Sequence, residues 1–242
     1  MNRESRIQKR RKSLLLAFAF ILTVLSYFLH RQITRGVFTP LIKGVYYHVE
    51  TEEKAVALTF EVVWEPGYTS EILDILDRHG ISCTFFLTGE WIRKNPNLAR
   101  EIAVRGHEIG QHSYSHKNLT EMDDEELAED FKKMSESLQE ELNLQTNLFR
   151  PPYGELDQRV FKYAQEHGYV TVVWSINPHD WQNPGKDEII NRIFKQLHNG
   201  AIILLHTNSE ETVEALPIIL QRLHFQGYKV LTFSELVQCS TK

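Results

Sequence analysis

The amino-acid sequence predicts an α/β protein: a compact or incomplete (β/α) barrel of about seven strands, preceded by one N-terminal membrane-anchor helix. Apolar, strand-like runs alternate with helical patterns, which is typical of parallel sheets. Five helical patterns end at a glycine that is soon followed by a strand. An uncharged apolar run near the N-terminus indicates the membrane helix.

The composition suits one large domain. Of the 242 residues, 42% are hydrophobic and 24% are charged, and the formal net charge is −5. Such a composition is typical of a globular protein and not of a disordered one. The mild net charge gives no reason to expect a nucleic-acid partner.

The first element is an apolar run over residues 14–29, preceded by the basic residues Arg3, Arg6, Lys9, Arg10, Arg11 and Lys12. As a helix the run would be about 24 Å long, somewhat short of a bilayer core of about 30 Å. The residues after it offer no convincing small-x-small site for signal-peptide cleavage. We therefore expect a cytoplasmic basic segment and signal anchor over residues 1–31, a linker over 32–53 and an extracytoplasmic domain over 54–242.

The strands and helices of this domain follow in order. The predicted strands span residues 56–60, 83–87, 108–111, 147–149, 170–174, 201–205 and 229–232. The clearest helix covers residues 123–142, where apolar residues recur at steps of three and four and four acidic residues lie at the start, favoured there by the helix dipole. A second helix is indicated over residues 189–197. The glycines predicted to end helices are Gly80, Gly106, Gly168, Gly200 and Gly227.

Polar and aromatic residues follow the ends of these strands. In a β/α barrel the functional residues lie at the C-terminal ends of the strands. Here these ends carry Glu61, His112, His116, Arg150, Asp180, Trp181 and His206. Each residue alone has a structural explanation, such as a solvated strand end, a surface cation or a core aromatic. The four-residue spacing of the first two histidines is also not sufficient evidence for a metal site. Together, at one rim, the residues predict a functional site.

Five ordered motifs resemble those of the polysaccharide deacetylases of the NodB-homology type, carbohydrate esterase family 4. The motifs are LTFEVVW at 58–64, HSYSH at 112–116, RPPYGE at 150–155, HDW at 179–181 and ILLHT at 203–207. The resemblance covers about residues 54–237. It implies a distorted (β/α) barrel, a divalent metal cofactor with zinc as the expected ion, and removal of acetyl groups from N-acetylated sugars in chitin-like polymers or peptidoglycan.

The resemblance also implies roles for individual residues. His112 and His116 would bind the metal. His206 would be the general acid, with its pKa raised by Asp180. The backbone N–H of Tyr153 would face the oxyanion from a loop stiffened by prolines. The expected catalytic group is Glu61, Arg150, Tyr153, Asp180 and His206, and the expected substrate-binding residues are Pro152, Trp174 and Trp181, although core packing is an equally open interpretation of the two tryptophans.

The first motif departs from the family pattern. The usual Asp-Asp pair, a general base followed by a metal ligand, is replaced by Glu61-Val62. Since valine binds no metal, either Glu61 reaches the metal or waters and substrate complete its coordination. A subset of the family known from spore-forming bacteria resembles this chain more closely, with an Asp followed by an apolar residue and then a Trp. Val62, Val63 and Trp64 fit that pattern, and Glu61 does not.

The sequence therefore leaves two functions open. The first is a monomeric, metal-dependent hydrolase that deacetylates peptidoglycan or a related N-acetylated cell-wall glycan. The alternative is a catalytically degenerate relative that binds glycan or a cell-wall partner without turnover.

Overall fold

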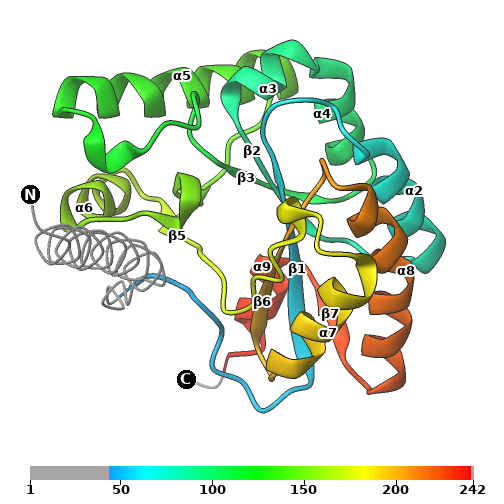
Figure 1. The fold of residues 1–242 in the computed structure, drawn as a ribbon. Helices are drawn as coiled ribbons and strands as arrows, with labels where there is room; N and C mark the ends of the chain where they lie inside the picture. Colours follow the sequence, from blue (N-terminus) through cyan, green and yellow to red (C-terminus); the bar gives the residue numbers. More distant parts are fainter. Residues whose placement is uncertain (1–43, 241–242) are drawn as a thin grey trace, which may run out of the picture. The chain divides into compact units, whose positions relative to one another are not determined.

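The computed structural model describes residues 44–240 (Figure 1). The basic segment and anchor predicted over residues 1–31 lie outside the described residues, as does the first part of the predicted linker. Within residues 44–240, no helix has both the length and the apolar content needed to cross a membrane.

The described residues form an α/β fold built on one curled, parallel sheet that makes a half-barrel. The strands are β1 (Ala55–Val62), β2 (Thr84–Leu87), β3 (Glu108–Gln111), β4 (Leu148–Phe149), β5 (Val170–Thr171), β6 (Ala201–His206) and β7 (Lys229–Leu231). Their order is β5-β4-β3-β2-β1-β6, and β7 pairs with the N-terminal half of β1. The expected incomplete barrel of parallel strands is thus confirmed for this part of the chain.

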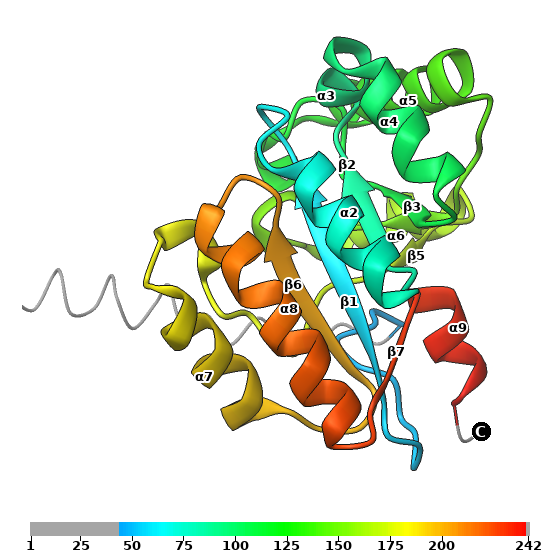
Figure 2. The ribbon, with the colours of Figure 1, turned by 90° about the vertical axis from the view of Figure 1, so that its right-hand side faces the viewer.

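The helices surround this sheet. They are α2 (Thr69–His79), α3 (Gly89–Lys94), α4 (Pro96–Val104), α5 (Asp124–Leu142), α6 (Gln158–Glu166), α7 (Lys186–Gln196), α8 (Glu210–Phe225) and α9 (Phe233–Gln238). Figure 2 shows α2, α8 and α7 side by side over β1 and β6. The predicted helix over residues 123–142 is α5, and it begins with a capping box in which Asp123 and Glu126 bond each other's backbone N–H groups.

The central strand β1 is buried on both faces, and its alternating side chains divide the core in two. Val56, Leu58, Phe60 and Val62 join the larger core with the surrounding helices. Ala55 and Ala57 join a smaller core on the other face, which α9 covers with Phe233 and Leu236. Because side chains alternate along a strand, the odd-numbered residues of β1 share this second face.

Glycines connect several helices to the strands that follow, as expected. Gly80, Gly106, Gly168, Gly200 and Gly227 all have positive φ angles. Gly200 is the most constrained, because a Cβ atom there would lie 1.7 Å from the carbonyl oxygen of Val49.

The prediction of a strand over residues 170–174 is wrong in its extent. β5 ends at Thr171, and the carbonyls of Val172 and Val173 accept hydrogen bonds from the side chain of Arg150 instead of from a neighbouring strand. Beyond the end of β5, the backbone pairs through isolated β-bridges: Tyr46 pairs with Val172, and Ile176 pairs with Ile203 of β6. Residues 46–48, inside the segment predicted as a linker, therefore contribute to the sheet.

Candidate active site

The C-terminal ends of β1, β3 and β6 bring three titratable side chains together. Glu61 Oε2 lies 3.4 Å from His112 Nε2 and 3.3 Å from His206 Nε2. Glu61 and His206 are register partners on adjacent strands, which fixes their proximity. His112 Nδ1 donates to the backbone carbonyl of Arg150 at 2.8 Å, so its Nε2 is the nitrogen that faces Glu61.

The loop after β3 positions His116, the second histidine of the pair. Ser113 and His116 have φ angles of 63° and 55°, in the left-handed region that non-glycine residues seldom adopt. Asp130, buried on α5, holds this loop. Its carboxylate accepts from the backbone N–H groups of Tyr114 at 2.8 Å and Ser115 at 3.1 Å, and from the hydroxyl of Ser115 at 2.7 Å. A helix side chain thereby stabilises the strained loop.

Glu61, His112 and His116 form a set that fits a divalent metal. Within the described residues they are the group of His, Cys, Asp and Glu side chains whose ligand atoms could share one ion, all lying within 4.8 Å of one another. Two ligands of a tetrahedral zinc ion are about 3.3 Å apart, close to the separation of Glu61 Oε2 and His112 Nε2. His112 Nε2 and His116 Nδ1 are buried without a hydrogen-bond partner. Burial, together with nearby His112, lowers the pKa of His116 to about 3, so its imidazole is neutral and available for coordination.

Position 62 takes no part in this set. β1 continues to pair with β2 through Val62 and Leu87, so the side chain of residue 62 points away from that of Glu61. Val62 is fully buried and joins the larger core with Leu58 and Phe60. Of the two expected alternatives, the geometry therefore favours the one in which Glu61 itself reaches the metal.

His206 and Asp180 form a hydrogen-bonded pair beside Glu61. Asp180 Oδ1 accepts from His206 Nδ1 at 2.8 Å, and Asp180 Oδ2 accepts from the backbone N–H of His206 and from the Thr212 hydroxyl, both at 2.7 Å. Burial alone would lower the pKa of His206, but hydrogen bonds to Asp180 and Glu61 outweigh it and raise the pKa to about 10. The imidazole is thus held as an imidazolium whose Nε2 faces the cluster.

Arg150 lies beneath the same cluster, so its interpretation as a surface cation is wrong. Its side chain is fully buried, donates to the carbonyls of Val172 and Val173 at 3.3 and 2.8 Å, and covers the ring of Phe86 at 4.0 Å. One guanidinium nitrogen lies 3.7 Å from Glu61 Oε1. Burial lowers the pKa of Arg150 to about 10 against the opposing effect of Glu61, so the group stays cationic at neutral pH.

Three aromatic residues that follow the strand ends are exposed: Trp64 (58%), Tyr153 (57%) and Trp181 (50%). Tyr153 has a φ of 62°, and its ring centroid lies 4.7 Å from that of His116. The exposure of Trp181 excludes the interpretation of this residue as a core plug. Residues in a strained backbone conformation, such as Tyr153, gather at functional sites.

The two other predicted substrate-binding residues are less accessible. Trp174 is half-buried and packs against the smaller core, and a Cβ on Gly154 would lie 2.7 Å from its ring. Pro152 is buried and so offers little surface for the predicted substrate contact.

Asp130, Thr212 and Trp64 were not among the site residues predicted from the sequence. Asp130 did leave a signal, because it lies on the apolar stripe of α5, three residues after Leu127 and four before Met134, where a carboxylate needs buried partners.

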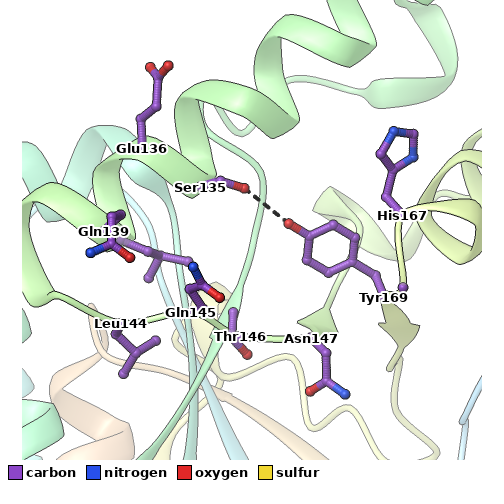
Figure 3. A pocket seen from close by; sticks show the side chains of 11 residues that line it. Ser135, Glu136, Gln139, Leu144, Gln145, Thr146, Asn147, His167 and Tyr169 are labelled. Atoms are coloured by element: carbon purple, nitrogen blue, oxygen red, sulfur yellow. Dashed lines mark hydrogen bonds between the residues drawn. The ribbon is translucent and has the colours of Figure 1, made fainter.

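One hollow in the described residues lies away from this cluster. It has a volume of about 450 Å³ and lies between α5 and the segments that precede β4 and β5 (Figure 3). Ser135 and Tyr169 hydrogen bond across it at 3.1 Å. Its lining belongs to the N-terminal ends of the strands and includes none of the predicted site residues. A much smaller hollow, of about 10 Å³, is lined by Glu61, Trp64 and His206, among other residues. Because the smaller hollow contains the titratable side chains of Glu61 and His206, it is the better candidate for the active site.

The chain is similar to known proteins in both sequence and fold. A family model described as polysaccharide deacetylase matches residues 48–172. A peptidoglycan-N-acetylglucosamine deacetylase of Bacillus cereus is 40% identical over 202 residues, which cover 80% of this chain and 93% of that protein. A peptidoglycan-N-acetylmuramic acid deacetylase of Bacillus subtilis is 36% identical over 196 residues, covering 79% and 74%. Among solved structures, a carbohydrate esterase family 4 pseudoenzyme from Bacillus anthracis matches with a TM-score of 0.78 and 32% identity over 84% of this chain and 72% of that one. A mutant of that pseudoenzyme with restored enzymatic activity matches with a TM-score of 0.79.

Proposed function

Because the chain belongs to the polysaccharide deacetylase family, we propose that it is a metal-dependent N-deacetylase of peptidoglycan or a related N-acetylated cell-wall glycan. One observation carries the proposal: three buried donors, Glu61, His112 and His116, lie directly beside the His206–Asp180 pair. Two of the similar proteins are named as peptidoglycan deacetylases, which supports this class of substrate.

His112, His116 and Glu61 would hold the ion, and zinc suits these nitrogen and oxygen donors. When bound, such an ion polarises a carbonyl and makes water acidic enough to attack it at neutral pH. Arg150, buried beside Glu61 Oε1, would orient the carboxylate so that its Oε2 faces the imidazoles.

His206 would supply the proton that an amide leaving group needs. An amine leaves readily only when its nitrogen is protonated, and His206 Nε2–H faces the cluster while Asp180 holds the opposite nitrogen. By the family resemblance, the backbone N–H of Tyr153 would stabilise the developing oxyanion, and Trp181 would contact the sugar.

Glu61 would have to serve both as a metal donor and as the acceptor of a proton from water. Glu61 is the carboxylate that faces the imidazoles of His112 and His206, whereas Asp180 is already hydrogen bonded to His206 and Thr212. A carboxylate that donates to a metal is a weaker base, so we expect a slow enzyme.

A catalytically degenerate protein that binds glycan without turnover is the second candidate. Two observations favour it: position 62 supplies no ligand, and a pseudoenzyme is among the similar solved structures.

We further propose that residues 1–31 anchor the chain with its domain outside the cytoplasm, supported by the basic cluster and the apolar run.

Mass spectrometry of N-acetylglucosamine oligomers incubated with the zinc-loaded full-length chain tests the activity. We expect loss of acetyl groups, and we expect His206→Ala to reduce the rate by about 10²–10⁴-fold while zinc stays bound, because the imidazole donates a proton and no metal bond. Equal rates for the two proteins would contradict the assigned chemistry. No deacetylation by the wild type, together with binding of the oligomer, would favour the second candidate.

A further inference from the structure

Trp64 is a large apolar side chain that remains exposed although its backbone is fixed. The side chain is 58% exposed, whereas the neighbouring Val63 is buried. The Thr88 hydroxyl donates to the Val63 carbonyl at 3.2 Å, and the Trp91 indole N–H donates to the Glu65 carbonyl at 3.0 Å. These bonds on both sides of Trp64 hold the loop in place, so its exposure is built into the structure.

The position of Trp64 links it to the cluster. Its ring lies edge-on to His116, with centroids 5.2 Å apart, and the ring of Tyr153 approaches the same imidazole at 4.7 Å. Trp64 also lines the small hollow that contains Glu61 and His206.

The size of this hollow limits what can enter it. Its volume of about 10 Å³ is about the smallest that can hold one water molecule. A hexopyranose is far larger, so its ring must remain on the rim while only its acetamide approaches the cluster. The ring will therefore meet the exposed side chains of the rim first.

We propose that Trp64 is a specificity-determining residue that packs against the apolar C–H face of a sugar ring in the glycan. The inference rests on the proposed function, because it assumes that the bound polymer carries the acetamide to Glu61 and His206. Indole offers the largest rigid apolar face among the side chains and loses little conformational freedom when it is covered. A glycan bound through this face is recognised by its ring, independently of the proton transfers at the cluster.

A competing role for Trp64 is to shield His116 and a bound ion from water. The two roles differ in their effects. A shield would weaken metal binding when it is removed, whereas a sugar platform would weaken glycan binding and leave metal binding unchanged.

The experiment measures two affinities in the full-length chain, that for zinc and that for an N-acetylglucosamine pentamer, by titration calorimetry. The variants are Trp64→Ala, the conservative Trp64→Phe, and Phe225→Ala, which removes another exposed aromatic side chain at the C-terminal end of α8. We expect Trp64→Ala to weaken pentamer binding roughly tenfold, with the zinc affinity within about twofold of wild type. Trp64→Phe should recover most of the loss, and Phe225→Ala should change neither affinity.

Turnover adds a second readout. Trp64→Ala should raise KM for the pentamer and leave kcat/KM unchanged for N-methylacetamide, which has no ring. Unchanged pentamer affinity in Trp64→Ala, or a fall in zinc affinity that matches the fall in pentamer affinity, would overturn the inference. A wild type that binds the pentamer in a Trp64-dependent manner but releases no acetate would refute the proposed activity and leave the inference standing.

Discussion

Glu61 contacts two imidazoles and one guanidinium, and these contacts determine its charge. One oxygen faces His112 and His206, and the other faces Arg150. Burial would raise the pKa of Glu61, but the two histidines outweigh it and hold the pKa well below the usual range, so the group is a carboxylate. An ionised, buried carboxylate whose Oε2 faces the imidazole of His112 is suited to a metal.

Glu61→Gln tests this role directly. We expect a zinc affinity lower by about 10–100-fold and loss of acetate release, because the neutral amide is a poor zinc donor and cannot accept a proton. Glu71→Gln, an exposed change in the first turn of α2, is the matched control. Zinc titration decides the outcome: if Glu61→Gln binds zinc as tightly as wild type, Glu61 is a base and not a ligand.

The His206–Asp180 pair predicts the pH dependence. The imidazolium is the acid form, and Asp180 raises its pKa above the ordinary histidine value, so kcat should fall only at alkaline pH. The same shift stabilises the fold: the contribution is fully present below the ordinary histidine pKa of about 6.5 and is lost as the pH rises through about 10.

Asp180→Asn removes the charge that raises this pKa. We expect the alkaline limb of the kcat profile to move down toward neutral pH in the zinc-loaded protein, with zinc affinity unchanged. Measurement of kcat from pH 5 upward checks this. An alkaline limb that stays in place would show that His206 is not the titrating acid.

At the scale of elements, the sequence predicted those features that depend on local patterns. Alternating runs, helix-ending glycines and the acidic start of α5 each follow from the conformation of one segment. The residues at strand ends were also predictable, because parallel strands end at one edge. Contacts between distant segments could not be predicted from the sequence. The early end of β5 depends on Arg150, and the orientation of Val62 depends on the pairing of β1 beyond Glu61.

Asp130 shows how one helix supports the site from a distance. Because its carboxylate accepts three hydrogen bonds from the loop between His112 and His116, Asp130→Asn should loosen that loop. We expect the free energy of unfolding to fall by about 1–3 kcal/mol and the zinc affinity to fall roughly tenfold. Urea unfolding and zinc titration measure the two effects.

Asp124→Asn is the matched control for this change, since the Asp124 side chain belongs to the same helix and is 87% exposed. Lower stability of Asp130→Asn with an unchanged zinc affinity would show that Asp130 supports the fold and not the metal site.

At the scale of the whole molecule, the proposed anchor makes a separate prediction. Full-length protein should partition with membranes and expose its domain outside the cytoplasm, because an uncharged run follows a basic cluster. A chain beginning near Gly36 should be soluble and folded, since the sheet is complete within residues 44–240. Cell fractionation and protease accessibility check this, and recovery of the full-length chain in the cytosol would refute the anchor.

We propose that Glu61, His112 and His116, buried in this fold, support metal-dependent deacetylation. The most direct test is acetate release from purified peptidoglycan by the full-length chain, measured before chelation, after chelation and after zinc is restored. We predict that release stops on chelation and returns with zinc, since the three donors would hold the ion. Release that is unaffected by complete removal of metal, or no release from zinc-saturated protein, would contradict the claim.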